Sequence, residues 1–202
     1  MKKDKFRIET DSMGDLKVPM DAKWGAQTQR ALDNFCISDL TMPSEFISAL
    51  GLIKWSAALT NEQLGLISKE KSKSIQKAAQ NLIDGDVNEE FLVDVFQTGS
   101  GTSSNMNANE VIASIASLLT DEKIHPNDDV NMSQSSNDVV PTAISVAAMI
   151  RLKESLLPAL NNIISSLGHK SDSLQDVVKT GRTHLMDAMP ITLAQEVDGW
   201  KH

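Results

Sequence analysis

The spacing of hydrophobic residues changes near residue 40. Before it, the segments Phe6–Thr10 and Leu16–Val18 alternate apolar and polar residues, which predicts two short strands joined by a turn at Asp11–Asp15. After it, apolar residues recur at intervals of three and four, the period of an amphipathic helix. The first such stripe is Phe46, Ala49, Leu50, Ile53 and Ala57, and it follows Ser44, a candidate N-cap.

Further helices are predicted from boundary residues as well as from stripes. Ser68 can cap a helix that Gly85 ends, and Pro141 suits the first turn of the longest helical pattern. Pro158 lies within that pattern and should kink or split it, and Pro190 opens the last helix. The stripes are Ile75, Ala78, Ala79, Leu82 and Ile83; Ala108, Val111, Ile112, Ile115, Ala116 and Leu119; Ala143, Ile144, Ala147 and Ala148, resumed by Leu156, Leu160, Ile163, Ile164 and Leu167. Together they predict a mainly α-helical protein with minor β-structure near the N-terminus.

Three segments of small polar residues interrupt this pattern where a helix is predicted to begin: 98–105, 131–138 and 180–184. The N-terminus of a helix presents unpaired N–H groups and a partial positive charge, so it attracts anions. Glycine allows close approach of the backbone, and Ser or Thr hydroxyls can hold a carboxylate without neutralising it. Any one loop alone is more typical of ordinary helix caps, but three such loops in one chain, one with Arg and His, weaken that interpretation. The glycines are not followed by Gly-Lys-Ser/Thr, so none is a Walker phosphate loop.

His184, in the third loop, is the best candidate for an acid or base, because an unperturbed imidazole exchanges protons at about pH 6.5. A structural role for a single loop histidine is the alternative. His125 precedes the turn sequence Pro126–Asp129, whose simpler interpretation is the geometry of helix entry. Two adjacent aspartates with no second histidine at ligand spacing do not predict a metal site.

The composition excludes several classes of partner. The 202 residues carry a net charge of −8, which argues against nucleic acid or an anionic membrane surface. Aromatic residues make up 4% of the chain, too few for a base-stacking surface. No secretory signal and no run of about 18 apolar residues occurs, and a lone Cys36 fits a reducing compartment. These features predict a soluble intracellular protein.

Several motifs occur in an order that resembles the class II fumarate hydratases, within the fumarase/aspartase superfamily. They are Trp24–Arg30, Gly99–Thr102 with Ser104–Asn107, Asn109–Val111, His125–Asn131, Gln134–Asp138 and Gly181–Leu185. The similarity covers nearly the whole chain from about Phe6. Several motifs in this order are far more specific than any single loop.

This resemblance implies an enzyme that adds water reversibly to fumarate, giving L-malate, without a cofactor. It implies that the dicarboxylate is bound by Ser100, Gly101, Thr102, Ser135, Ser136 and Asn137, joined by Thr183 from another subunit. His184 would be the catalytic acid or base, acting through a water. His125, Asn127 and Asp128 match the second anion site of the family.

The resemblance also implies a domain organisation. Residues 1–131 would form a small N-terminal domain, and residues 132–202 the beginning of a central long-helix bundle. Full-length members form homotetramers in which three subunits build each active site. The expected compartment is the cytoplasm, or the mitochondrial matrix in a eukaryote.

The end of the sequence leads us to expect an N-terminal portion of a longer protein. The helical pattern that Pro190 opens stops at His202 without a glycine or a polar tail. The flexible loop that supplies the second catalytic group in the family, a serine, does not occur before His202. We therefore expect the 202-residue chain alone to be inactive.

Two other classes of function stay open on the sequence alone. Aspartases look similar, but they typically carry Gln in place of His184 and lack a counterpart of His125. A non-catalytic structural protein is the other, since the superfamily includes lens crystallins, although His184 and the three polar loops speak against it. Met186 and Met189 replace residues common in fumarases and leave the resemblance intact.

Overall fold

The computed structural model describes residues 5–202, and its internal contacts divide the chain into two compact units, Met1–Ala148 and Met149–His202. Each unit is described by itself. The predicted domain limit after Asn131 falls within the first unit and stays a prediction.

The first unit begins with an antiparallel hairpin of β1 (Phe6–Asp11) and β2 (Gly14–Pro19), as predicted. Gly14 turns the chain with a φ of 110°, a value that glycine adopts without steric cost. The Arg7 guanidinium donates to the carbonyls of Pro19, Ala22 and Trp24, each within 2.8 Å. These bonds fix the segment that leads from the hairpin to α1 (Ala26–Asn34).

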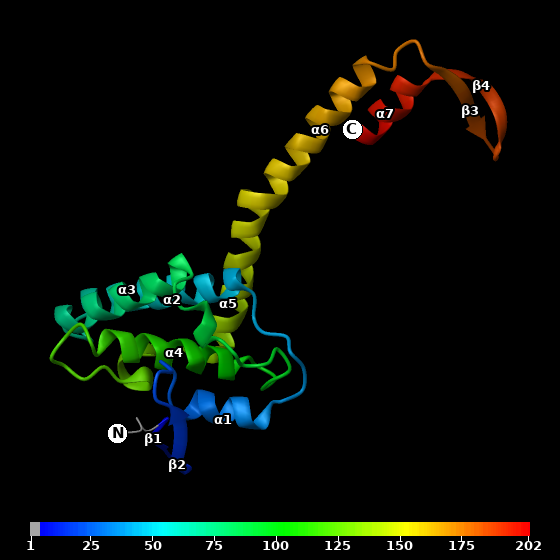
Figure 1. Cartoon of the computed structure of the whole chain (residues 1–202). Helices are drawn as coiled ribbons and strands as arrows, with labels where there is room; N and C mark the ends of the chain where they lie inside the picture. Colours follow the sequence, from blue (N-terminus) through cyan, green and yellow to red (C-terminus); the bar gives the residue numbers. More distant parts are fainter. Residues whose placement is uncertain (1–4) are drawn as a thin grey trace. The chain divides into compact units, whose positions relative to one another are not determined.

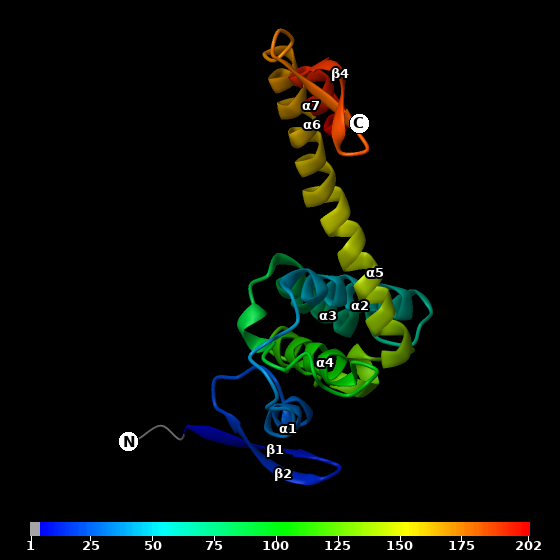
Figure 2. The ribbon, with the colours of Figure 1, turned by 90° about the vertical axis from the view of Figure 1, so that its right-hand side faces the viewer.

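Helices α2 (Ser44–Gln63), α3 (Lys69–Asp84) and α4 (Thr102–Ala116) form the body of the first unit (Figures 1 and 2). The short helix η1 (Asn88–Glu90) lies between α3 and α4, and η2 (Pro126–Val130) precedes α5 (Ser136–Arg151). Ser68 caps α3 by accepting from the Lys71 N–H, and Gly85 ends it with a φ of 82°, as predicted. Ser44 is already helical, and Pro43 occupies the N-cap position instead.

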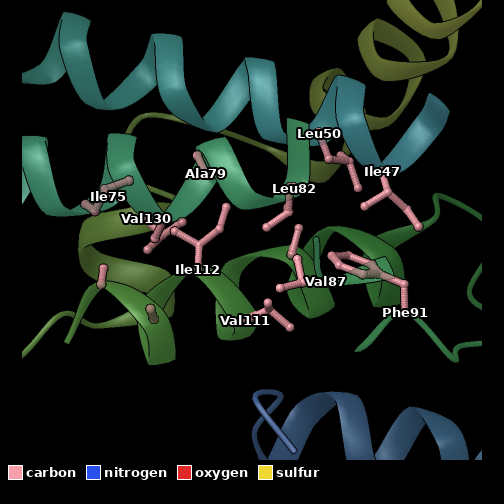
Figure 3. Packing of buried hydrophobic residues seen from close by; sticks show 14 of the residues in the cluster. Ile47, Leu50, Ile75, Ala79, Leu82, Val87, Phe91, Val111, Ile112 and Val130 are labelled. Atoms are coloured by element: carbon pink, nitrogen blue, oxygen red, sulfur yellow. The ribbon is translucent and has the colours of Figure 1, made fainter. Parts of the chain in front are cut away.

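The core of the first unit lies where α2, α3 and α4 meet (Figure 3). Figure 3 shows Leu82 of α3 between Leu50 of α2 and Val111 of α4. The predicted stripes supply this core, whose fully buried members include Leu50, Ile75, Leu82, Val111 and Ile112. Burying these side chains is the main favourable contribution to folding of this unit.

The two prolines of the longest helical pattern have different effects. Helix α5 begins at Ser136, so Pro141 lies inside it rather than in its first turn as predicted. A π-helical segment, η3 (Leu152–Leu156), comes before α6 (Leu157–Asp172), where Pro158 stands at the start. The predicted interruption of the helix near Pro158 is therefore confirmed, since a proline interrupts the regular bonding of the preceding turn.

The second unit contains a hairpin that the sequence did not predict. Strands β3 (Val178–Thr183) and β4 (Met186–Thr192) pair antiparallel, and α7 (Leu193–Lys201) follows them beside α6 (Figure 1). The prediction that segment 180–184 precedes a helix is wrong, because these residues lie in β3 and its turn. Pro190 lies in β4 instead of opening the last helix, which Thr192 and Gln195 cap reciprocally.

No helix in residues 5–202 combines the length and apolar character that crossing a membrane requires.

We expect Gly51→Ala to destabilise the first unit. A Cβ at this position of α2 would lie 2.9 Å from Leu82 Cβ and 3.0 Å from the Ala79 carbonyl oxygen, so α2 and α3 would have to separate. Overpacking of this kind costs about 1–3 kcal/mol and the gain in helix propensity is about 1 kcal/mol, so the net loss of stability is up to about 2 kcal/mol. The measurement is the free energy of unfolding in urea. Gly199→Ala, where no atom lies within 4 Å of the added carbon, is the control and should leave stability equal or higher.

Candidate active site

The first polar loop leads into the N-terminus of α4. Gly101 has a φ of 69°, and a Cβ there would lie 2.9 Å from Val140, so only glycine fits this position. Its N–H donates to the Thr98 carbonyl at 2.8 Å, and the Ser100 and Thr102 hydroxyls share a hydrogen bond of 2.9 Å. The loop therefore presents two linked hydroxyls at the start of a helix.

Residues before and inside α4 hold this loop in place. The Gln97 side chain bonds reciprocally with Ser104, donating to its hydroxyl and accepting its N–H, both at 2.9 Å. Asp94 is buried and accepts the backbone N–H groups of Phe96 and Ser38. These bonds, that of Phe96 first, hold the pKa of Asp94 below its ordinary value.

The second polar loop leads into the N-terminus of α5. The Ser135 hydroxyl accepts the Asn137 N–H at 3.3 Å, and the Ser135 carbonyl accepts the Val139 N–H at 2.9 Å. The Ser136 hydroxyl faces α4 and accepts from the Asn105 amide at 2.9 Å. Ser135 and Asn137 are exposed, whereas Ser136 is half-buried.

The two loops meet at one cavity of about 380 Å³. Thr98, Gly99, Ser100 and Gly101 of the first loop and Asn137 of the second line it, together with apolar side chains that include Met42 and Val140. None of the described residues that line it carries a charge. Two helix N-termini, hydroxyls and a side-chain amide therefore converge on a small space, an arrangement that suits a carboxylate.

Beneath the second loop lies a buried lysine. Lys54 of α2 is fully buried, and its ammonium donates to Asn131 Oδ1 and Gln134 Oε1, each at 2.9 Å. Asn105 and Asn109 of α4 donate to the same oxygen of Asn131 at 3.2 and 3.1 Å. Burial lowers the pKa of Lys54 to about 7, because the charged form loses its hydration.

The residues of the predicted second anion site lie around η2. His125 Nδ1 accepts the Asp128 N–H at 3.1 Å and lies 3.1 Å from Asp128 Oδ2. The two contacts exclude each other, because Nδ1 accepts without a proton and pairs with the carboxylate only with one. His125 and Asn127 border a different groove, of about 790 Å³, which Arg7 also lines. These residues are therefore not part of the 380 Å³ cavity.

His184 lies at the tip of the hairpin in the second unit. It and Leu185 connect β3 to β4, and both have positive φ values, 50° and 61°. This is the pattern of a type I′ turn, which usually contains Asn or Gly. Thr183 ends β3 beside it, and both Thr183 and His184 are exposed.

The sequence did not predict which polar residues support the second loop. They are the buried Lys54, Asn105 and Asn109 and the half-buried Asn131 and Gln134. A signal for Lys54 was present, since it lies four residues after Leu50 and four before Ala58, on the buried face of α2. A lysine on an apolar stripe is unusual enough to indicate polar partners inside.

Titration of Lys54 should make stability depend on pH. Its folded pKa, about 7, lies below the ordinary 10.5, so between these values the unfolded chain binds more protons than the folded chain. We therefore expect this group to raise stability as the pH increases through that window, by up to about 1.4 kcal/mol per pH unit. Below this pH window the lysine is charged in both the folded and the unfolded state, so it does not make stability depend on pH.

The measurement is the free energy of urea unfolding at several pH values for the wild-type chain and for Lys54→Met. Methionine keeps the length of the side chain and cannot titrate, so the variant should lack this slope. Parallel profiles for the two proteins would contradict the assignment.

Comparisons with known proteins place these features in a family. A family model described as Lyase matches residues 14–202. Fumarate hydratase class II of Xylella fastidiosa (strain 9a5c) is 58% identical over 98% of this chain and 42% of that protein. The protein of the same name from Halobacterium salinarum is 51% identical over 97% of this chain and 43% of that protein. This chain thus spans less than half the length of these relatives.

Solved structures agree with the sequence matches. The crystal structure of a class II fumarase from Schistosoma mansoni matches with a TM-score of 0.92 and 41% identity over 97% of this chain and 43% of that one. The structure of a fumarate lyase:delta crystallin from Brucella melitensis bound to cobalt matches with a TM-score of 0.92 and 44% identity, over 97% of this chain and 44% of that one. These matches confirm the predicted resemblance and the mainly α-helical fold. The chain therefore belongs to the lyase family whose model matches residues 14–202.

Proposed function

We propose that this chain belongs to a fumarate hydratase, which adds water reversibly to fumarate to give L-malate. The observation that carries the proposal is the cavity shared by the first loop and Asn137, where two helix N-termini meet neutral donors. The names of the relatives at 51–58% identity support the same activity.

The chemistry explains why neutral donors suit this reaction. When L-malate is dehydrated to fumarate, a base removes a proton from the carbon beside a carboxylate, and the electron pair moves into that carboxylate. The hydroxyl on the neighbouring carbon then leaves with a proton as water. Donors that tighten on the carboxylate as its negative charge grows lower the barrier, since they bind the transition state more strongly than the substrate.

Each predicted site residue takes a role in this scheme. Ser100, Gly101 and Asn137 hold one carboxylate in the cavity, with Thr102, Ser135 and Ser136 beside them. His184 exchanges the proton on the hydroxyl side through a water, and Thr183 binds substrate next to it. His125 and Asn127, which line a groove of their own, form a second anion site with Asp128. No step in this scheme calls for a cofactor.

We also propose that the protein is a homotetramer in the cytoplasm, or in the mitochondrial matrix of a eukaryote. An apolar face on the second unit supports assembly: Leu156, Leu157, Leu160, Ile163 and Ile164 are 42–53% exposed. Contiguous apolar surface of this kind marks a surface that another protein covers. Assembly with other copies would also place Thr183 and His184 at a site to which another subunit contributes.

The activity test uses the protein expressed from its complete reading frame. Fumarate should be converted to L-malate, and L-malate to fumarate, with water as the added molecule. The same assay with ammonium present separates the rival chemistry, since an aspartase would form aspartate. Formation of aspartate without malate would contradict the proposal.

Removal of single donors from the cavity should weaken catalysis. We expect Ser100→Ala and Asn137→Ala each to lower kcat/KM about 10- to 100-fold, because each loses one hydrogen bond to a charged carboxylate. Steady-state rates of fumarate hydration are the measurement. Ser145→Ala is the control, since that exposed hydroxyl of α5 bonds only its own helix, to the Pro141 carbonyl, and should leave the rate unchanged.

Replacing the imidazole of His184 should affect kcat most. General acid–base groups contribute about 10²- to 10⁴-fold, so we expect His184→Asn to lower kcat by at least about 100-fold with assembly intact. The rate and the oligomer size are measured together, with His169→Asn on exposed α6 as the matched control. Wild-type turnover in His184→Asn would remove this residue from the mechanism.

A further inference from the structure

A single lysine contacts the segment that connects η2 to α5. Lys54 lies between Leu50 and Ala58 on the buried face of α2, and all three side chains are buried. Its ammonium reaches Asn131 Oδ1 and Gln134 Oε1 at 2.9 Å, across 77 and 80 positions of sequence. These two amide oxygens are its hydrogen-bond partners within residues 5–202.

Asn131 Oδ1 accepts hydrogen bonds from three side chains. Besides Lys54, it receives the side-chain amides of Asn105 and Asn109 from α4. The Asn131 amide in turn donates to the Gln134 carbonyl at 3.2 Å, which closes the turn on itself. One oxygen therefore ties the second loop to two helices that are remote in sequence.

The same contacts reach the cavity in two steps. Asn105, which bonds Asn131, also donates to the Ser136 hydroxyl at 2.9 Å. Ser136 begins α5, and the next residue, Asn137, lines the cavity. A shift of the turn at Asn131–Gln134 would therefore move both residues.

The charges nearby do not provide another partner for Lys54. Asp129, the acidic residue of η2 that is buried, accepts from the Lys71 ammonium at 2.8 Å and from the His125 N–H at 2.7 Å. Two side-chain oxygens of α4, Asn105 Oδ1 and Asn109 Oδ1, are buried and have no hydrogen-bond partner among the described residues. Loss of the lysine would leave Gln134 Oε1 without its donor, whereas Asn131 Oδ1 would keep the amides of Asn105 and Asn109. An unpaired acceptor in this half-buried turn is costly.

We infer that Lys54 is a positioning residue, which holds the Asn131–Gln134 turn so that Ser136 keeps its bond to Asn105 and Asn137 is set at the cavity. Its amine touches neither cavity nor substrate in this scheme. The part of the inference that concerns substrate rests on the proposed function, whereas the part that concerns the loop does not.

The first experiment needs no activity. Amide hydrogen exchange of the 202-residue chain is compared by mass spectrometry between wild type, Lys54→Met and Lys23→Met. Lys23 is the matched control, because its ammonium pairs with Glu90 at 2.9 Å, away from the second loop. We expect exchange in residues 131–138 to rise about tenfold in Lys54→Met alone, the effect of losing one buried hydrogen-bonded contact, while residues 107–113 of α4 stay protected. If residues 131–138 of Lys54→Met exchanged at the same rate as in the wild type, the inference would be overturned.

A second variant guards against failure of Lys54→Met to fold. Gln134→Met, at a half-buried position, removes an acceptor of Lys54 and also the amide that donates to the Val130 and Met132 carbonyls. It should therefore also raise exchange at residues 131–138. If the two side chains act as one contact, the double variant should exchange no faster than the faster of the two single variants. Additive increases would mean that Lys54 does not act through Gln134, and would overturn this route.

The second experiment uses the protein from its complete reading frame. We expect Lys54→Met to raise KM for fumarate about tenfold with a smaller change in kcat, because substrate binding needs the ordered loop. A general loss of folded protein would lower the apparent kcat and leave KM unchanged. Unaltered KM in an active variant would overturn the positioning role. If the wild type does not hydrate fumarate, the proposed function fails, and the exchange data still decide the role of Lys54 in the loop.

Discussion

Ten consecutive residues of α4, from Ser104 to Ala113, are buried, and five of them are polar. A buried polar group is costly unless it is hydrogen-bonded, so each of these side chains requires a partner from another segment. Glu110 accepts the backbone N–H groups of Gly25, Gln27 and Thr28, and thereby fixes the start of α1. Asn105 and Asn109 bond Asn131 in the second loop. Helix α4 thus fixes the positions of the start of α1 and of the second loop, which are both distant from it in sequence.

This constraint explains how a flexible type of sequence forms a defined site. Small polar loops are usually mobile, because few contacts oppose their conformational entropy. Here Gln97 and Ser104 brace the first loop, and Lys54 and Asn105 hold the second from below. At the cavity the Ser100 hydroxyl bonds its neighbour Thr102, whereas the groups behind the loops are bonded to other segments. Such preorganisation is what stabilisation of a growing charge requires.

Much of the fold could be predicted from the sequence because the apolar period and the capping residues act locally. Ser68 and Gly85 bound α3 through contacts within a few residues. Segment 180–184 was assigned wrongly because it contains the same small polar residues as a helix cap, while its turn at His184 and Leu185 lacks the usual Asn-Gly signal. The contact between Lys54 and Asn131 spans 77 positions, so no local pattern records it. The loops were found from composition, but their shared cavity follows from tertiary packing alone.

The turn at His184 and Leu185 has a consequence for how the hairpin is maintained. Left-handed backbone conformations cost a residue with a side chain roughly 1–2 kcal/mol, and here two such residues are adjacent. Leu185 is 97% exposed and so gains no burial in return. The paired strands must therefore supply the free energy that keeps the tip folded. The backbone of His184 is thus placed by the pairing of β3 and β4 and not by the side chains around the tip. Loss of this strand pairing would displace the histidine.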